Sequence, residues 1–260
     1  FVMEYGNYGY RDEKTGADYK TNRTNLEATM QRRMWHQNDP GVIPNLLITG
    51  RGAPTGILVY EGNLLPEPFR GQMIHAEPGR NVVWAFPAKQ VGAGYQASIT
   101  NLVHSKGDRN YRPSDVSVAP DGSLIIADWF DPVDCCHRTV NDAGRLFRVA
   151  PPKHAYSTPD FDFKTPAGAV KALRNPNLSV RYKAWTALQT MQEKARHALT
   201  KMAADKNPRF RARALWALAA IKGGTQKAIE MALKDEDDNL RALALRIARR
   251  HGMLIEPLVQ

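Results

Sequence analysis

The chain has few cysteines, and the two it has are neighbours. Cys135 and Cys136 are the only cysteines among 260 residues, so a framework of several disulfides is excluded. Apolar runs long enough to span a bilayer are also missing, and no transmembrane helix is predicted. No signal peptide opens the chain, which begins at Phe1. These absences exclude a disulfide-stabilised miniprotein, and nothing in these 260 residues is expected to span a membrane as a helix. Because the sequence starts at Phe1 without Met, targeting cannot be judged from this end.

Acidic residues are scarce in one part of the chain only. Residues 151–260 contain 20 Lys and Arg against 10 Asp and Glu, whereas residues 1–150 contain 16 of each. The whole net charge of +10 therefore lies in the second part. With 43% hydrophobic residues, the chain has enough apolar side chains for a sizeable core. The charge difference indicates two domains of different kind.

Short apolar segments recur in the first part, each bounded by Gly, Pro or Asn. They lie at residues 56–60, 71–75, 82–86, 98–103, 116–119, 124–127 and 145–149. Between two of them stands "PDG", which combines the fixed φ of Pro120 with a residue, Gly122, that is free to adopt a positive φ. This pattern predicts an antiparallel hairpin there. Many short strands with regular turns predict a sandwich, a barrel or a propeller.

The second part is repetitive. "RYKAWTAL" begins at Arg181, "RARALWAL" at Arg211 and "RALALRIA" at Arg241, so the copies are 30 residues apart. Alanines and leucines recur in register within them. After the polar linker at residues 151–164, this helical spacing predicts an α-solenoid resembling short HEAT-like repeats over residues 165–251.

The repeat arginines recur at the same phase, near the start of each second helix, where a cation is poorly placed against the helix dipole. The turn before each helix offers carbonyl and carboxylate acceptors. We therefore predict that Arg181, Arg211 and Arg241 form a structural ladder that joins successive repeats. The excess basic charge favours either a protein partner or a solvated outer face. Nucleic acid is not expected, because base-stacking aromatic residues do not interleave the charges.

Four stretches carry a resemblance to a known family. They are "EYGNYGY" (4–10), "APTGILVYEGNLLPEPFRGQMIHAEPGRNVVWAF" (53–86), "YRPSDVSVAPDGSLIIADW" (111–129) and "GRLFRVAP" (144–151). They resemble the C-terminal blades of the soluble glucose/sorbosone dehydrogenase β-propellers. The order of propeller, linker and HEAT-like repeats is similar to that of large membrane-bound dehydrogenases of planctomycete-type bacteria.

The resemblance implies a β-propeller portion followed by an α-solenoid, all-β then all-α. About three antiparallel blades would occupy residues 1–150, with a long loop near residues 11–40, a linker at 151–164 and HEAT-like repeats at 165–260. It also implies an internal piece of a periplasmic or exported bacterial protein. The parent would be a quinoprotein-like dehydrogenase that oxidises a sugar or alcohol. The alternative is a non-catalytic interaction protein that binds a glycan or a protein partner.

The cofactors that the resemblance implies are pyrroloquinoline quinone and Ca²⁺. Of the two arginines that help to bind the quinone in that family, Arg112 matches one, and Ser114 replaces the other. Arg80 stands in the loop where the family has a quinone-binding lysine. The family's catalytic histidine belongs to earlier blades, outside this chain.

Charged residues at strand ends are an independent indication of a site, because the blade-top turns of a propeller converge on a central channel. Asp115, Asp128, Asp131 and His137 stand at such ends beside Arg112. We interpret Asp115 and Asp128 as candidates for cofactor binding and Asp131 and His137 as candidates for metal binding. The alternative for the first pair is structural, with each carboxylate bonded to backbone N–H groups or to an arginine such as Arg145.

Two further motifs have several interpretations. The cysteines of "DCCH" lack the two-residue spacer of a haem attachment site, so no haem is expected; Cys135 and Cys136 could form a vicinal disulfide, a metal site with His137 or an inert loop. His36, beside Trp35, is either a general base facing a sugar or part of a loop that caps the core. His75, in an apolar segment, is expected to be a hydrogen-bonded core histidine.

Overall fold

The structure, a computed structural model, describes the chain except for residues 1–45, 48, 50–54, 93, 131–142 and 259–260. It divides into two compact units. The sheet unit comprises the described residues of Phe1–Tyr60, Glu67–Ser117 and Ile125–Arg148, and the helical unit comprises those of Glu61–Pro66, Val118–Leu124 and Val149–Gln260. Two short segments from the first half of the sequence, 61–66 and 118–124, thus belong to the helical unit.

The sheet unit contains a four-stranded antiparallel sheet with the strand order β1-β2-β3-β6. Its strands are β1 (Ile57–Val59), β2 (Met73–Glu77), β3 (Val82–Phe86) and β6 (Thr100–His104). In the central strands β2 and β3, successive residues are buried, among them Ile74, His75, Val82 and Val83. Because neighbours along a strand point to opposite faces, both faces of the sheet are covered at its centre.

A three-stranded sheet has the order β7-β8-β9. It consists of β7 (Pro113–Val118), β8 (Leu124–Asp128) and β9 (Arg145–Val149). A tight turn joins β7 to β8: Gly122 has a φ of 91°, and Oδ1 of Asp121 accepts bonds from the backbone N and the hydroxyl of Ser123. The turn predicted at "PDG" is confirmed.

The structure contains a hairpin that the sequence did not predict. It consists of β4 (Ala88–Val91) and β5 (Gly94–Ala97). Nearly all its side chains are exposed. Such strands lack the alternation of apolar and polar residues that marks a half-buried strand, which is why the pattern misses them. The remaining short elements are the 3₁₀ turns η1 (Glu67–Phe69), η2 (Pro78–Arg80) and η3 (Glu256–Leu258).

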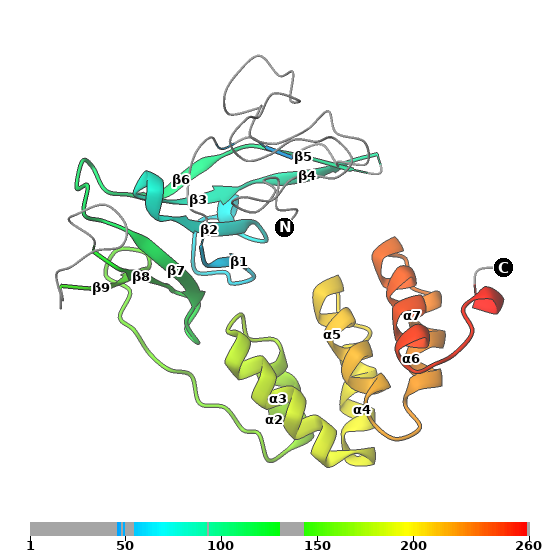
Figure 1. The fold of residues 1–260 in the computed structure, drawn as a ribbon. Helices are drawn as coiled ribbons and strands as arrows, with labels where there is room; N and C mark the ends of the chain where they lie inside the picture. The colour runs from blue at the N-terminus through cyan, green and yellow to red at the C-terminus, as the bar shows by residue number, and fades with distance from the viewer. Residues whose placement is uncertain (1–45, 48, 50–54, 93, 131–142, 259–260) are drawn as a thin grey trace, which may run out of the picture. The chain divides into compact units, whose positions relative to one another are not determined.

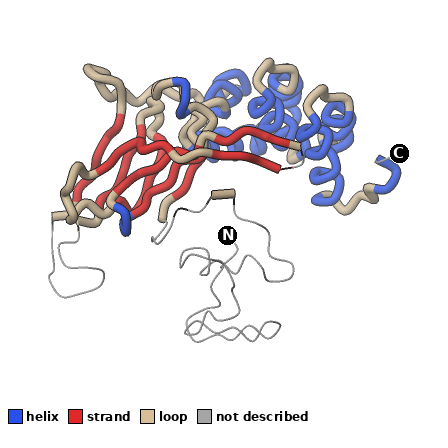
Figure 2. Tube along the Cα trace, turned by 90° about the horizontal axis from the view of Figure 1, so that it is seen from above, coloured by secondary structure: helices blue, strands red, loops and turns tan. Residues whose placement is uncertain are grey.

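Residues 166–250 form six α-helices, which follow one another as pairs (Figures 1 and 2). They are α2 (Pro166–Leu173), α3 (Leu178–Met191), α4 (Glu193–Met202), α5 (Pro208–Ala219), α6 (Thr225–Leu233) and α7 (Asp238–Arg250). Each pair consists of a first helix (α2, α4 or α6) and a second helix (α3, α5 or α7). The second helix α5 contacts both α3 and α7, and the first helix α2 contacts α4. We call α3, α5 and α7 the second-helix row, and α2, α4 and α6 the first-helix row.

The polar turns between the helices of each pair act as caps. The side chain of Asn177 accepts a bond from the backbone N of Val180, that of Asn207 from Arg209, and that of Asp237 from Asn239. Each side chain satisfies a backbone donor that the first turn of a helix leaves unpaired. The polar turns found in the sequence therefore lie inside each helix pair and start the second helices.

The in-register residues of the repeats form the core of the helical unit. Ala184, Ala214 and Ala244 are fully buried, as are Leu188 and Leu218. Small alanines let neighbouring helices approach closely, and the leucines fill the space between them. The predicted helical repeat is confirmed in this register.

The propeller remains a prediction. The described residues form separate sheets of four, three and two strands. The four-stranded antiparallel sheet is compatible with one blade, but these sheets do not close around a channel in the described part. Within the described residues, no helix is both long and apolar enough to cross a membrane.

Candidate functional site

The start of α5 carries arginines at alternate positions, Arg209, Arg211 and Arg213. Residues four apart lie on the same side of a helix, so Arg209 and Arg213 point together and Arg211 points elsewhere. The preceding second helix, α3, carries Arg181 at the position equivalent to Arg211. Arg181, Arg209 and Arg213 converge on one carboxylate.

That carboxylate belongs to Glu61, in segment 61–66 of the helical unit. Its Oε2 accepts hydrogen bonds from Nη1 of Arg181 and Nη2 of Arg213, and its Oε1 lies 3.9 Å from Nε of Arg209. The side chain of Glu61 is 18% exposed, and that of Arg213 is 14% exposed. This burial makes the pairs stronger and more costly to disrupt than pairs on an open surface.

The three guanidinium groups and the carboxylate also affect the pKa of Arg213. The pKa of Arg213 is lowered to about 10, chiefly because burial removes the hydration of its cation; Glu61 opposes this shift, and Arg181 and Arg209 add to it. Arg213 therefore stays protonated at neutral pH, and it forms a pair of opposite charges with Glu61.

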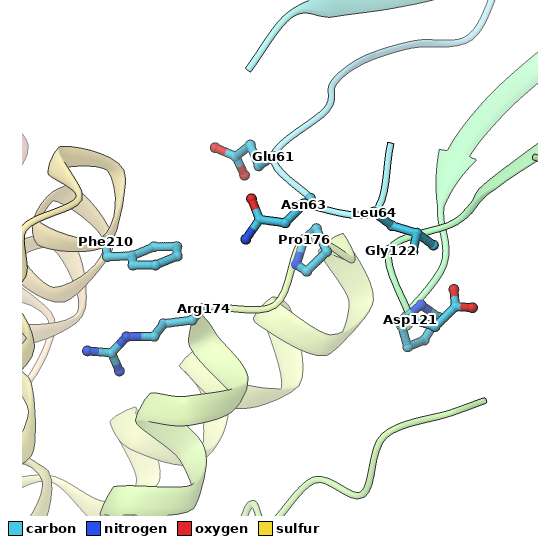
Figure 3. A pocket seen from close by; sticks show the side chains of 10 residues that line it. Glu61, Asn63, Leu64, Asp121, Gly122, Arg174, Pro176 and Phe210 are labelled. Carbon is cyan, nitrogen blue, oxygen red and sulfur yellow. The ribbon is translucent and has the colours of Figure 1, made fainter. Parts of the chain in front are cut away.

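A pocket of about 360 Å³ opens beside Glu61 (Figure 3). Phe210, Pro176 and Leu64 supply apolar surface, while Asn63 and Arg174 supply polar groups. The ring of Phe210 points toward Asn63 and Pro176. The pocket thus combines apolar surface with charges of both signs, because Glu61 and Asp121 line it together with Arg174.

Segment 118–124 forms another wall of the pocket and is fixed by the turn before α3. Nδ2 of Asn175 donates to the carbonyl of Pro120 at 2.9 Å, and Nδ2 of Asn177 donates to the carbonyl of Val118 at 2.6 Å. Asn177 therefore caps α3 with its oxygen and holds the wall with its nitrogen.

Arg211 points away from this cluster and joins two repeats. Its Nε and Nη2 bind the two carboxylate oxygens of Asp235, each at 2.8 Å, and its Nη1 donates to the carbonyl of Asp205 at 3.1 Å. Burial of Asp235 opposes ionisation, but the bonds from Arg211 and the Asp237 backbone outweigh it and lower the pKa of Asp235. The predicted ladder is confirmed at Arg211.

The other two arginines of the series behave differently. Arg241 donates to the carbonyls of Asp235 and Glu236 in its own turn, which agrees with the ladder. Arg181 binds Glu61, which lies outside the repeats, so the ladder prediction is wrong for Arg181. A contact between repeats is made instead by Arg174, whose Nη2 binds Asp205 at 2.9 Å.

Aromatic rings lie among the arginines of the second-helix row. The guanidinium of Arg250 in α7 lies 5.6 Å from the ring of Trp216 in α5, and that of Arg213 lies 5.4 Å from Phe210. Arg246 and Arg249 are exposed on α7. Phe210 and Trp216 are therefore close to arginines in space, and the expectation that nucleic acid is not a partner stays a prediction.

Among the predicted cofactor residues, Arg112 and Asp128 are brought together in the sheet unit. Oδ1 of Asp128 accepts a bond from the backbone N of Arg112 at 2.7 Å, and Oδ2 accepts one from Nε of Arg145 at 2.6 Å. The side chain of Asp128 is fully buried. Nη1 of Arg112 donates to the carbonyl of Pro78 at 3.0 Å. These bonds are structural, and they match the alternative in which Asp128 pairs with Arg145.

Arg80 and Asp115 have different surroundings. Arg80 is exposed at the end of η2, two residues after the carbonyl that binds Arg112. Oδ1 of Asp115 accepts a bond from the backbone N of Val116, and it lies so close to Gly56 that a Cβ there would be 1.9 Å away. Binding of a quinone or Ca²⁺ by Arg80, Asp115 and Asp128 stays a prediction.

The remaining candidates lie outside the described residues. They are His36, Asp131, His137, Cys135 and Cys136. Within the described part of the chain, no three His, Cys, Asp or Glu side chains are grouped as metal ligands.

His75 is buried, as predicted, but its hydrogen bonding differs from the expectation. Its ring packs against Trp84 and Phe86, with ring centroids 5.7 and 5.0 Å away. Its Nε2 has no hydrogen-bond partner among the described residues. Burial lowers the pKa of His75, because the charged imidazolium would lose its hydration.

Sequence analysis missed Glu61, the residue at the centre of the arginine cluster. Glu61 follows a short strand and precedes "GNLLP", and neither feature distinguishes it from an ordinary loop carboxylate. Its partners lie 120 and 152 residues further along the chain. Only the tertiary structure brings these residues together.

Comparison with known families agrees with the helical repeats. Residues 10–153 match the model of a family described as a domain of unknown function (DUF7133), and residues 166–249 match the model for HEAT repeats. The first match covers more than half of the 260 residues. No curated protein and no solved structure matches the chain. The HEAT-like repeats are confirmed, and these matches do not support the resemblance to a dehydrogenase.

Proposed function

Because this chain belongs to the DUF7133 family, whose description assigns no function, we propose from its own contacts that its HEAT repeats bind an acidic segment of a protein partner. The observation that carries the proposal is the convergence of Arg181, Arg209 and Arg213 on the carboxylate of Glu61. Guanidinium groups bind carboxylates through matched hydrogen-bond geometry, and the second-helix row already binds one.

The charge and shape of the helical unit support a protein partner. Residues 151–260 have 20 basic and 10 acidic residues, and Arg246, Arg249 and Arg250 are exposed on α7. Repeat arrays present extended surfaces of this kind to other chains. Electrostatic attraction would accelerate association with an acidic segment and would weaken as salt increases.

A glutamate-rich peptide is a suitable probe, with fluorescence anisotropy as the measurement. Replacing Arg246, Arg249 and Arg250 with Ala should weaken binding by about tenfold, because three cations leave the second-helix row. A matched control removes three exposed cations from the first-helix row, as Lys194→Ala, Lys201→Ala and Lys227→Ala. The control should bind within about twofold of the wild type.

An equal loss in both triple variants would contradict the proposal, since only net charge would then matter. Tighter binding of a single-stranded oligonucleotide than of the peptide, at the same salt concentration, would also contradict it. The interleaved rings of Phe210 and Trp216 make this second probe necessary.

The quinoprotein-like dehydrogenase stays a separate prediction from resemblance, as do its sugar or alcohol substrate, a glycan ligand and an exported location. Arg112 and Asp128, two of its predicted cofactor residues, make structural bonds to the rest of the sheet unit. Calorimetric titration with pyrroloquinoline quinone and Ca²⁺ measures directly whether the protein binds these cofactors. Binding that Arg112→Ala abolishes would favour the enzyme over the docking module.

A further inference from the structure

The outward side of α3 carries large apolar side chains that do not reach the core. Leu178 and Tyr182 are four residues apart, so they lie on the same side of the helix, and they are 70% and 68% exposed. Among the exposed side chains of α3, only Lys183 is charged. We call Leu178 and Tyr182 the apolar end of the second-helix row. The other end, at α7, has three exposed cations, which we call the α7 arginines: Arg246, Arg249 and Arg250.

The 30-residue register places the apolar end and the basic end on one face of the row. Tyr182 in α3 corresponds to Ala212 in α5 and to Ala242 in α7. Arg246 follows Ala242 by four residues, so it lies one helical turn further along the same side of α7. Because equivalent positions of a repeat array point the same way, Tyr182 and Arg246 share a face of the row.

Trp216 lies on this face between the two ends, one helical turn beyond Ala212. The centre of its partly buried ring is 5.6 Å from the guanidinium of Arg250, so α5 and α7 meet on this face. A segment that crosses from α3 to α7 passes over Ala212, whose side chain is small, and beside the Trp216 ring. The face therefore offers apolar contact between its two ends.

We propose that this face binds one extended segment of the protein partner, with apolar side chains against Leu178 and Tyr182 and carboxylates against the α7 arginines. The inference rests on the proposed docking function and adds a second requirement to it, an apolar anchor. Charge complementarity places the acidic end of the segment on α7, where three guanidinium groups are concentrated. Burial of the exposed leucine and tyrosine places the apolar end on α3.

The distance between the two ends determines the spacing that the partner needs. Adjacent packed helices lie about 8–10 Å apart, and α5 stands between α3 and α7, so the two ends are about 20 Å apart. An extended chain advances about 3.3 Å per residue, so about six residues separate the apolar anchor from the carboxylates. A segment with a much shorter spacer reaches only one of the two ends.

The test uses labelled peptides and the full chain, with fluorescence anisotropy as the measurement. The long peptide joins two leucines to four glutamates through six Gly and Ser residues. A second peptide has serines in place of the leucines, and a third has a spacer of two residues. Each is made in both chain directions, and the tighter direction is compared.

Two double variants test the position of the anchor. Leu178→Ser/Tyr182→Ser removes the apolar end of the row. Ile57→Ser/Leu146→Ser is the matched control, because it removes two exposed apolar side chains from the sheet unit, which are 55% and 75% exposed. Thermal unfolding verifies that each variant is folded. All the substituted side chains are exposed, so little stability is expected to be lost.

The long peptide should bind the wild type about tenfold more tightly than the serine peptide or the short peptide does, because only the long peptide buries apolar surface at α3. Leu178→Ser/Tyr182→Ser should abolish this difference, and the control should retain it. Equal affinity of the long and serine peptides for the wild type would overturn the proposal. A difference that survives in Leu178→Ser/Tyr182→Ser, or a short peptide that binds as well as the long one, would also overturn it.

The glutamate-rich peptide separates a failure of this inference from a failure of the docking function. If that peptide binds and is weakened by replacing the α7 arginines, while the leucines add nothing to the long peptide, the apolar anchor is wrong and the docking function stands. If replacing the α7 arginines weakens neither peptide, the docking function is wrong, and this inference is wrong with it.

Discussion

At the scale of single residues, the arginines of the repeats have two roles that their spacing does not reveal. Arg211 is 7% exposed and binds Asp235 through two nitrogens, which joins the second repeat to the third. Arg213, two residues later, faces Glu61. A helix separates the directions of residues two apart, so one arginine can join two repeats while its neighbour binds a carboxylate from outside the repeats.

Arg211→Ala is expected to lower the free energy of unfolding by about 3 kcal/mol, because it leaves the buried carboxylate of Asp235 without its partner. Thermal and denaturant unfolding measure the loss. Arg246→Ala, at an exposed position in α7, is the control and should change stability by less than about 0.5 kcal/mol. Binding of the glutamate-rich peptide should be the same in Arg211→Ala as in the wild type. Unchanged stability together with lost peptide binding would instead assign Arg211 to the binding surface.

At the scale of elements, the turn before α3 carries more interactions than the equivalent turn before α5. Asn177 caps α3 through its oxygen and holds the carbonyl of Val118 through its nitrogen. The side chain of Asn207 caps α5 by accepting a bond from the backbone N of Arg209. Comparing substitutions at these two equivalent positions therefore separates the contribution of the helix cap to stability from that of the bond to Val118.

Asn207→Ala should cost about 1 kcal/mol of stability, the usual value of a helix cap. Asn177→Ala should cost more, about 2 kcal/mol, because a buried carbonyl also loses its donor. Asn177→Asp keeps a capping oxygen and removes the donor, so it should cost about 1 kcal/mol, the difference between these two values. Equal losses for Asn177→Ala and Asn207→Ala in denaturant unfolding would show that the bond to Val118 contributes little.

At the scale of the whole molecule, carboxylates at the turns link the stability of the helical unit to pH. The pKa of Asp205 is lowered, first by the bond from the backbone of Asn207 and also by Arg174, and the pKa of Asp235 is lowered by Arg211 against the effect of burial. A carboxylate whose folded pKa lies below its unfolded value of 3.8 stabilises the fold above that pH. This stabilisation is lost as the pH falls through the folded pKa.

The wild type should therefore lose helical stability between about pH 5 and about pH 3, as the turn carboxylates are protonated. The double variant Asp205→Asn/Asp235→Asn should be less stable at neutral pH and should depend less on pH across this range. Circular dichroism at the helix signal, measured during heating at each pH, provides the comparison. Parallel curves for the two proteins would show that other groups control the acid transition.

The sequence by itself determined the organisation of the helical unit. The 30-residue spacing of Arg181, Arg211 and Arg241, together with polar turns and buried alanines, was sufficient because neighbouring repeats contact each other along the chain. It also predicted most strands and the turn at Gly122, since local backbone preferences and alternating burial decide these features. The β4–β5 hairpin could not be predicted from the sequence, because its exposed strands carry no such pattern.

Only the tertiary structure decided what the charged residues do. The buried pairing of Asp128 with Arg145 was one of two interpretations of a strand-end carboxylate, and the lack of a hydrogen-bond partner for Nε2 of His75 within the described residues had no local signal. The cluster around Glu61 joins residues more than a hundred positions apart. An ion pair forms only where two side chains lie close together in space. When the partners belong to different elements, their spacing along the sequence does not reveal that distance.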